Sequence, residues 1–421
     1  MITLIEALNY RCLRYVRQPL GPFQILVGPN AIGKTTFLDV VALLSRLVSD
    51  GLDPAMEERT SNFLDLLWQR TGERFEVAIE AAIPEERREL LADSRFDTIR
   101  YEVAFAVDEK TLETYIAAEK GLLKISQNEV TEEQRMLFPV GRGVPETIIT
   151  SLKEKNTRTL FNKTPGGNDN YHADAHGKEG RWAPSFKLGQ RKSTLGNLPE
   201  DETNFPVSTW FKQFLDEGVE RLILNSLKIR RASPPGLDTG FQPDGGNLPW
   251  VVADLHKNSP ERLEEWVRHV RIALPDLEGI TTVVRPDDRH QYLKLLYDGG
   301  LEVPSWMASD GTLRLLALTL PAYLPSANLK AVYLIEEPEN GIHPRAVETM
   351  YQSLSSVYDG QILMATHSPV ILSTAKPSDV LCFGKTDAGA TDIVTGDKHP
   401  ELADWRGEVD LGTLFASGVL G

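Results

Sequence analysis

Residues 28–36 carry the residue types that a bound phosphate chain requires. Their sequence, GPNAIGKTT, matches the pattern GxxxxGK followed by Ser or Thr at every fixed position. Glycines in such a loop allow backbone N–H groups to surround an anion, and the following helix adds a partial positive charge. We expect the Lys34 ammonium to reach the β- and γ-phosphates and the Thr35 hydroxyl to bind Mg²⁺. The residues expected to contact the nucleotide are Asn30, Ala31, Ile32, Gly33, Lys34, Thr35 and Thr36.

The sequence on either side of this loop has the pattern that the motif needs. Residues 23–27 form a short apolar run that predicts a buried strand, and residues 35–47 predict a helix. The alternative is an ordinary glycine-containing turn between a strand and a helix. The complete motif with both flanks favours a site for a nucleoside triphosphate.

Two acids and a histidine follow apolar runs in the last third of the chain. Residues 331–335 end at Glu336 and Glu337, and residues 361–366 end at His367. Residues 344–357 predict a helix between the two runs. Runs that are apolar on both faces and joined by a helix indicate a buried parallel sheet, whose ligands lie at the carboxyl ends of the strands. The strand at 23–27 should belong to the same sheet.

This acid pair has the chemistry that phosphoryl transfer to water requires. Such a reaction needs a metal ion that neutralises the phosphates and a group that orients the attacking water. We expect Glu336 to hold the Mg²⁺ shell through a water molecule and Glu337 to orient the nucleophilic water. A solvated strand end is the structural alternative for the pair.

The rest of the chain predicts a scaffold of several parts. Strands are expected at 2–8 and 12–16, and a helix at 54–68. Alternation between apolar and polar residues over 75–81 and 101–107, continuing through 112–125, indicates a half-buried antiparallel sheet.

The stretch 139–250 has no clear periodicity, and we interpret most of it as a long loop with a function or with mobility. Within and after it, the sequence predicts a helix over 208–217, a strand over 221–224 and a helix from 260 to about 273. His172 and His176 lie in the loop and are a weak alternative for a metal site, because no further Cys or His is near in sequence.

Composition places the chain among soluble globular proteins. The 421 residues have a net charge of −15, and no apolar run approaches the roughly 18 residues of a membrane span. No basic segment typical of a signal peptide opens the chain. The two cysteines, Cys12 and Cys382, predict packing residues in a reducing compartment, so we expect a cytoplasmic protein without a membrane partner.

One stretch departs from the acidic balance of the chain. Residues 150–192 contain nine Lys and Arg residues against four acids. The net charge of the whole chain argues against indiscriminate nucleic-acid binding, but this stretch is a candidate for local contact with DNA. A solvated loop is an equal alternative.

Four motifs in order, GPNAIGKTT, SDGTLR, VYLIEEPENGIHP and ATHSP, resemble those of the ATP-binding-cassette (ABC) ATPases. The resemblance is greatest to the branch that holds chromosome-maintenance and DNA-repair ATPases, the overcoming-lysogenization-defect (OLD) family and bacterial phage-defence ATPases. It implies an α/β P-loop fold with a mixed sheet, a buried parallel core, an antiparallel β lobe and a helical or irregular insert. The expected division is 1–138 for the first part of the ATPase domain, 139–290 for an inserted lobe and 291–421 for the second part.

The resemblance also implies roles for single residues. Residues 308–312 match the signature sequence, which assigns Ser309 and the Gly311 backbone to the γ-phosphate of an ATP held by another subunit. Glu337 takes the role of catalytic carboxylate, and His367 that of γ-phosphate sensor. Residues 339–343 form the loop that crosses the dimer interface.

Two further assignments rest on position. Arg11, in the segment Asn9-Tyr10-Arg11, resembles the N-terminal arginine that lies near the nucleotide in this family. Gln69 is the candidate for the glutamine that couples Mg²⁺ to the inserted lobe.

Three departures from the family pattern limit the resemblance. The signature reads Ala-Ser-Asp-Gly-Thr, which weakens an analogy with transporters. Glu336 replaces the usual aspartate, and its extra methylene favours contact with Mg²⁺ through water. There is no long coiled coil, and only residues 368–421 follow His367, so we expect any nuclease to be a separate chain.

The function implied is an ATPase switch. ATP and Mg²⁺ are its expected cofactors, and its ATP-bound homodimer or higher oligomer would control a separate effector, with a nuclease as candidate, in defence against phage. The first alternative is a DNA-repair or chromosome-associated ATPase that contacts DNA itself. The second is an ATP-dependent scaffold with little hydrolysis, against which the acid pair argues.

Overall fold

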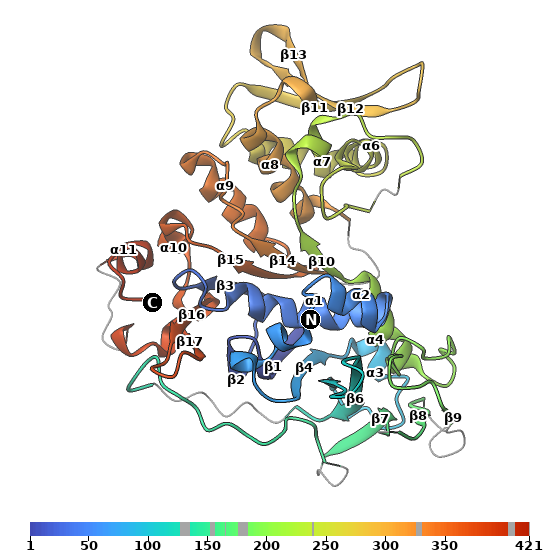
Figure 1. Cartoon of the computed structure of the whole chain (residues 1–421). Helices are drawn as coiled ribbons and strands as arrows, with labels where there is room; N and C mark the ends of the chain where they lie inside the picture. The colour runs from blue at the N-terminus through green and yellow to red at the C-terminus, as the bar shows by residue number, and fades with distance from the viewer. Residues whose placement is uncertain are drawn as a thin grey trace. The chain divides into compact units, whose positions relative to one another are not determined.

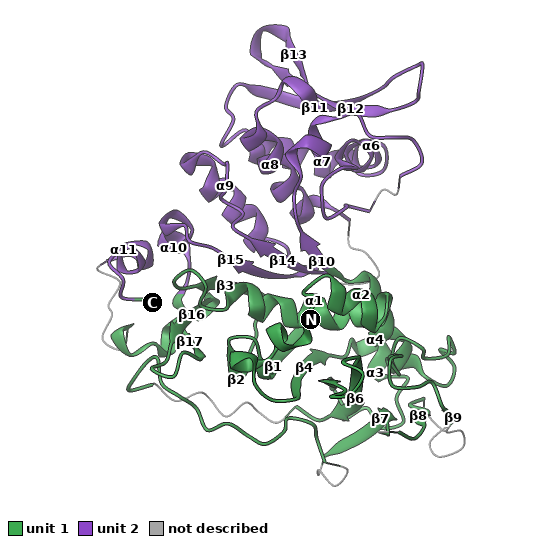
Figure 2. Ribbon diagram, viewed as in Figure 1, with its two compact units in different colours: residues 1–219, 377–406, 420–421 green, residues 220–376, 407–419 purple. Residues whose placement is uncertain are grey.

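The computed structural model describes most of the chain, namely residues 1–126, 135–151, 156–164, 166–175, 184–237, 240–325, 331–402 and 409–420. These residues form two compact units (Figure 2). Unit 1 contains residues 1–219, 377–406 and 420–421, and unit 2 contains residues 220–376 and 407–419. Both units therefore draw on segments that are distant in sequence.

An eight-stranded antiparallel sheet makes up much of unit 1 (Figure 1). Its strand order is β2-β1-β4-β5-β6-β7-β8-β9. The sequence prediction of an antiparallel sheet is confirmed, and the observed sheet extends further along the chain than 125. The strands are β1 (Ile2–Tyr10), β2 (Leu13–Pro19), β4 (Arg74–Ala82), β5 (Thr98–Val107), β6 (Thr114–Lys124), β7 (Thr157–Lys163), β8 (Asp169–Tyr171) and β9 (Ser185–Phe186).

Helix α1 (Lys34–Ser49) is the longest helix among the described residues of unit 1. It packs against β1, β4 and helix α4 (Pro206–Glu217), and its Phe37 ring lies 5.7 Å from that of Phe383. Phe383 belongs to β16 (Val380–Lys385), which pairs in parallel with β3 (Phe23–Val27) and antiparallel with β17 (Thr391–Thr395). Because both sides of α1 pack against other elements of unit 1, the residues at its N-terminus are held in place.

The helix predicted over 54–68 is wrong. The structure has a short helix, α2 (Leu52–Glu57), followed by the 3₁₀ turns η1 (Phe63–Leu66) and η2 (Trp68–Arg70). The Asn62 side chain accepts a hydrogen bond from the Leu64 N–H and starts a separate turn. Directly after the predicted range, Gln69 and Arg70 have positive φ angles of 51° and 57°, which a helix does not adopt.

Unit 2 contains two buried parallel strands, as the sequence predicts. Strand β14 (Val332–Glu336) pairs with β15 (Gln361–Ala365), with Glu336 opposite Ala365 at their carboxyl ends. Helix α9 (Pro344–Ser355) connects them. Strand β10 (Val219–Leu222), of which the last three residues lie in unit 2, is the neighbour of β14.

Helices and a small antiparallel sheet complete unit 2 (Figure 1). Thr319 joins three of the helices, because its hydroxyl accepts a hydrogen bond from Trp266 Nε1 and its carbonyl accepts one from Ser353 Oγ, both at 2.8 Å. The elements are α5 (Ser226–Arg230), α6 (Leu248–Asn258), α7 (Pro260–Val270), β11 (Leu277–Val284), β12 (Gln291–Tyr297), η3 (Asp298–Gly300), β13 (Leu301–Pro304), η4 (Ser305–Met307), α8 (Asp310–Thr319), η5 (Leu320–Tyr323), α10 (Pro369–Thr374) and α11 (Leu411–Ala416).

Most of the described residues in 139–250 lie outside helices and strands, as the sequence analysis expected. Besides the predicted helix α4, the stretch contains three strands of the large sheet, the helix α5 and the first residues of α6. Strands β8 and β9 are three and two residues long, which is too short for a periodic pattern to be recognised. Unit 1 also contains α3 (Glu85–Arg88) and the turns η6 (Pro377–Asp379), η7 (Gly396–Lys398) and η8 (Pro400–Leu402). Among the described residues, no helix is long and apolar enough to cross a membrane.

Candidate active site

The phosphate loop of unit 1 joins β3 to α1 and depends on two glycines. Gly28 and Gly33 have φ angles of 142° and 111°. A Cβ atom on Gly28 would lie 2.5 Å from the Phe383 carbonyl oxygen, and one on Gly33 would lie 2.7 Å from Cys12 Sγ. Both positions therefore exclude a side chain by conformation and by space.

The N-terminus of α1 has the features of an anion site. Its N-cap residue, Gly33, offers no side chain to the helix, and the first turn contains no acid. Lys34 is buried in the loop, where its Nζ donates hydrogen bonds to the carbonyl oxygens of Gly28 at 2.7 Å and Pro29 at 2.9 Å. Thr35 is exposed and Thr36 is buried. The loop thus holds a positive charge and the positive end of a helix dipole together.

The turn between β1 and β2 and the strand β17 both contact this loop and support it. Cys12 Sγ donates to Thr36 Oγ1 at 3.6 Å, and the Thr391 hydroxyl donates to the Ile32 carbonyl at 2.6 Å. The Thr391 N–H in turn donates to the Cys12 carbonyl at 3.1 Å. Cys12 is therefore a packing residue at the loop, and this support was not foreseen from the sequence.

Arg11 lies beside α1, one turn beyond the loop. Its Nη1 is 3.6 Å from Oδ2 of Asp39, a buried residue of α1 that also pairs with Arg59 at 2.7 Å. Burial, and then the Asp39 carboxylate, raise the pKa of Tyr10, whose hydroxyl donates to Asp39. The structure therefore places the predicted Arg11 at the helix that carries Lys34 and Thr35.

Gln69 follows a segment that contacts the turn between β1 and β2. Leu67 forms a β-bridge with Tyr10, and the Leu66 carbonyl accepts a hydrogen bond of 2.8 Å from the Arg11 N–H. The Gln69 side chain is exposed. Its role at Mg²⁺ stays a prediction.

In unit 2, the acid pair lies at the carboxyl end of β14. The Glu337 N–H donates to the Ala365 carbonyl at 2.8 Å, which extends the strand pairing by one residue. Glu337 has a φ of 46°, an uncommon conformation for a residue other than glycine. Its exposed carboxylate accepts a hydrogen bond from Asn340 Nδ2 at 2.5 Å. Local strain and this bond fix the direction of the Glu337 side chain.

Glu336 has a different partner. Its Oε1 accepts a hydrogen bond of 2.8 Å from Nη2 of Arg221 on β10. The Arg221 side chain is 43% exposed and that of Glu336 is 29% exposed. The sequence analysis did not single out Arg221, because the two residues are 115 positions apart.

Glu339 connects the end of β14 to the end of β15. Its Oε1 accepts hydrogen bonds from Thr366 Oγ1 at 2.7 Å and from the His367 N–H at 2.9 Å. His343, at the end of the same loop, caps α9 by accepting from the Arg345 N–H. The predicted interface loop and the predicted γ-phosphate sensor are thus one bonded assembly within unit 2.

The signature segment begins α8. Ser309 is the N-cap, and its Oγ accepts a hydrogen bond of 3.1 Å from the Thr312 N–H. Arg230 of α5 donates to the Trp306 carbonyl at 3.1 Å and forms an ion pair with Asp310. Ser309 is exposed, and these contacts hold the segment in place.

The donors fit Mg²⁺ bound together with a nucleotide. Among the residues that the structure describes, no three His, Cys, Asp or Glu side chains are grouped to hold a metal ion. Mg²⁺ commonly takes one or two protein oxygens and completes its shell with phosphates and water. In unit 1 the exposed Thr35 hydroxyl offers such an oxygen. In unit 2 the partly exposed Glu336 carboxylate offers another.

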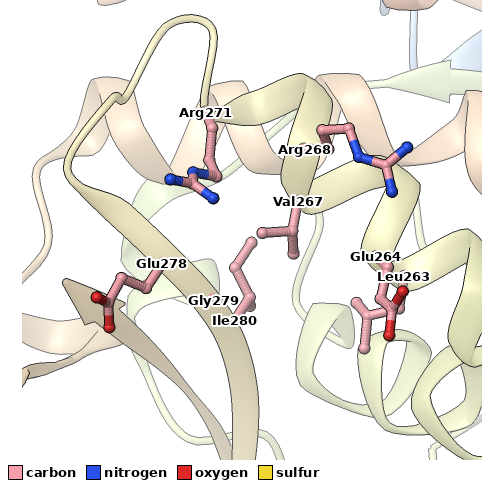
Figure 3. Close-up of a pocket in the computed structure, with 8 residues that line it drawn as sticks. All are labelled: Leu263, Glu264, Val267, Arg268, Arg271, Glu278, Gly279 and Ile280. Carbon is pink, nitrogen blue, oxygen red and sulfur yellow. The ribbon is translucent and has the colours of Figure 1, made fainter. Parts of the chain in front are cut away.

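A pocket of about 270 Å³ lies elsewhere in unit 2 (Figure 3). Its walls come from α7 and β11, with Arg268 and Arg271 along one side and the apolar side chains of Val267 and Ile280 between the walls. None of the motif residues lines it. It is a feature separate from the candidate site.

The basic stretch 150–192 has fewer exposed cations than its sequence indicates. Lys163 is buried and pairs with Asp169 at 2.5 Å, Arg158 donates to the Ala173 carbonyl, and Arg191 pairs with Asp53. Lys187 and Lys192 are exposed. Lys153, Lys155, Lys178, Arg181 and His176 lie outside the described residues.

The fold and the motifs define a P-loop ATPase with a fold of the ABC type. The chain belongs to the family described as "AAA domain, putative AbiEii toxin, Type IV TA system", which matches residues 23–373. The resemblance inferred from the sequence is thereby confirmed.

Solved structures support the same fold. An Smc head bound to the C-winged helix domain of ScpA is 12% identical, with a TM-score of 0.53 over 93% of this chain and 96% of that one. An Smc head with an extended coiled coil, bound to the C-terminal domain of ScpA from Pyrococcus furiosus, is 12% identical, with a TM-score of 0.51 over 96% and 98%. At this identity the likeness establishes the fold.

A short segment is similar to a curated protein. It is 43% identical over 44 residues to the OLD nuclease of Thermus scotoductus (strain ATCC 700910 / SA-01). The match spans 10% of this chain and 8% of the nuclease. It supports the relation to OLD proteins and covers only a small part of that enzyme.

Proposed function

We propose that this chain is an ATPase switch that assembles around ATP and controls a separate effector. The observation that carries the proposal is the loop of residues 28–36, in which Lys34 lies buried at the N-terminus of α1 and donates to the Gly28 carbonyl. Such a site binds a phosphate chain. The acid pair at the end of β14 supplies a carboxylate that can orient the attacking water. A protein that only binds ATP does not need such a group.

In the proposed reaction, water attacks the γ-phosphorus in line with the bond to the leaving oxygen of ADP. Glu337 orients this water and accepts its proton, and Asn340 holds the carboxylate in place. Lys34 exchanges its carbonyl partners for phosphate oxygens. Thr35, and Glu336 through a water molecule, would hold Mg²⁺, which would neutralise the phosphate charges. His367 contacts the γ-phosphate and reports its loss.

The proposed active unit is a dimer that shares two ATP molecules. Ser309 and the Gly311 backbone of one subunit would close over the γ-phosphate bound by Lys34 of the other. Such a head-to-tail pairing is self-complementary, as two-fold symmetry requires. ATP then acts as a switch, because the γ-phosphate bridges the subunits and hydrolysis removes the bridge.

We propose a nuclease as the effector and defence against phage as the setting, in the cytoplasm. The family description names a putative toxin of a type IV toxin–antitoxin system, and the curated relative is a nuclease. A toxin and a nuclease are both activities that can damage a cell, which favours control by a switch. Purification of the chain from its native host with ATP and the Glu337→Gln change should retain the effector for identification.

A second candidate function is direct DNA binding. The exposed Lys187 and Lys192 favour it, whereas the engaged Lys163 and Arg191 do not. Reversal of Lys187 and Lys192 to Glu should weaken DNA binding and flatten its salt dependence. If the unchanged protein has no DNA affinity at low salt with ATP present, this second function is wrong.

Subunit mixing tests the leading proposal. Lys34→Ala and Ser309→Arg should each abolish hydrolysis when alone, because each damages both shared sites. A mixture contains dimers with one intact site, so part of the ATPase rate should return. Full activity of Ser309→Arg alone would contradict the shared site. Equal binding of ATP by Lys34→Ala and the unchanged protein would contradict the nucleotide site itself.

A further inference from the structure

Arg221 forms an ion pair with Glu336, the acid that we assign to the metal shell. It is on β10, the neighbour of β14, and its Nη2 donates to Glu336 Oε1 at 2.8 Å. Glu336 is the last residue of β14 and directly precedes Glu337. The contact therefore links an edge strand of unit 2 to the first acid of the pair.

Strand alternation explains why Arg221 faces Glu336. Successive side chains of a strand point to opposite faces of the sheet, so Glu220 and Arg221 diverge. Glu220 is near Tyr333, because its charge contributes, after burial, to the raised pKa of Tyr333. Three positions separate Tyr333 from Glu336, so Glu336 points to the other face, where Arg221 lies. The pairing thus follows from the register of two strands.

Glu336 needs such a partner more than the usual aspartate does. A glutamate has one more rotatable bond than an aspartate, and its carboxylate can take more positions. An arginine hydrogen bond restricts that freedom. Its positive charge also lowers the repulsion between the adjacent carboxylates of Glu336 and Glu337.

We propose that Arg221 is a positioning residue for Mg²⁺, which it serves by holding the Glu336 carboxylate in the orientation that the metal shell requires. This inference rests on the proposed function. A carboxylate accepts hydrogen bonds at both oxygens, so a bond from Arg221 to Oε1 is compatible with contact between the group and a metal-bound water. Partners that orient a metal-binding group typically affect metal affinity when they are changed.

The test measures the Mg²⁺ concentration at which ATP binding is half complete, with a fluorescent ATP analogue as probe. Arg221→Ala should raise this concentration about tenfold. Arg221→Lys should recover part of the loss, because it retains the charge but not the planar hydrogen-bonding group. Binding of the analogue in EDTA should not change. Arg231→Ala is the matched control, since Arg231 is an exposed arginine of the same region.

A double change separates positioning from a general effect. If Arg221 acts through Glu336, Arg221→Ala should cause no further shift in a Glu336→Gln background. An equal Mg²⁺ dependence in Arg221→Ala and the unchanged protein, or the same shift in both backgrounds, would overturn the inference. Thermal unfolding of each variant shows whether the fold is intact, which we expect because a partly exposed ion pair contributes little to stability.

Failure of the inference differs from failure of the proposed function. In the first case, Glu336→Gln raises the Mg²⁺ requirement and Arg221→Ala does not. In the second, the unchanged protein itself binds the analogue without any dependence on Mg²⁺ or on Lys34.

Discussion

The carbonyl oxygen of Gly341 lies 2.5 Å from the position that a Cβ atom on Gly311 would occupy. The first turn of the signature helix and the loop of residues 339–343 therefore touch backbone to backbone. Gly341 itself has a φ of 76°, which favours glycine. The two segments that we assign to the subunit interface are thus held as one surface within unit 2.

This contact makes Gly311→Ala an informative change. The added methyl group would collide with backbone that cannot yield by a rotamer change, so the signature turn or the loop must move. We expect a loss of about 1–3 kcal/mol in stability, as for overpacking, together with a loss of ATP-dependent dimerisation. Urea unfolding and size-exclusion chromatography with ATP measure the two effects. Gly143→Ala is the control, because a Cβ at Gly143 meets nothing within 4 Å.

Lys34→Ala should weaken ATP binding by about 2–3 kcal/mol, the range for hydrogen bonds that involve a charged group. The substitution also removes the bonds to the Gly28 and Pro29 carbonyls, so the loop should become less ordered. Calorimetric titration with ATP and Mg²⁺ gives the affinity. Lys110→Ala, at an exposed position outside the loop, should bind as the unchanged protein does.

Glu337→Gln should separate binding from hydrolysis. Glutamine has the same size and can keep a hydrogen bond to Asn340, but it cannot take the proton of the attacking water. We expect ATP binding to persist, hydrolysis to fall about 10²-fold or more, and the ATP-bound dimer to accumulate. Phosphate release and chromatography measure these results. Wild-type turnover in this variant would transfer the role to Glu336 or Glu339, and Glu261→Gln, at an exposed position of α7, is the control.

Glu220 should make the stability of unit 2 depend on pH. Burial raises its pKa from 4.5 to about 7, and its Oε2 is buried with no hydrogen-bond partner among the described residues. Between these two values the folded chain keeps a proton that the unfolded chain has released. Stability therefore falls as pH rises from 4.5 to about 7, and the loss then stays constant.

Glu220→Gln removes this titration. Its stability should exceed that of the unchanged protein at pH 7.5, and the difference should shrink at pH 5. Urea unfolding at both pH values measures it. Asp174, whose pKa burial raises to about 6, titrates in both proteins and does not affect the difference. A difference that is constant with pH would contradict the assignment.

The sequence by itself determined the parts of the site that local patterns encode. The strand at 23–27, the phosphate loop and the helix after it have nearly the predicted bounds, and so do the apolar strands that end at Glu336 and Ala365. A complete motif or a short apolar run is enough to predict its own structure, because backbone conformation and burial there depend on adjacent residues.

Only the tertiary structure decided which distant residues support these motifs. Arg221 meets Glu336 across 115 positions, Glu339 binds the His367 backbone across 28, and the Thr391 hydroxyl binds the Ile32 carbonyl across 359. Such contacts depend on strand register and on packing between elements, neither of which has a local period in the sequence. For the same reason the short strands β8 and β9 could not be predicted, since their pairing partners alone make them strands.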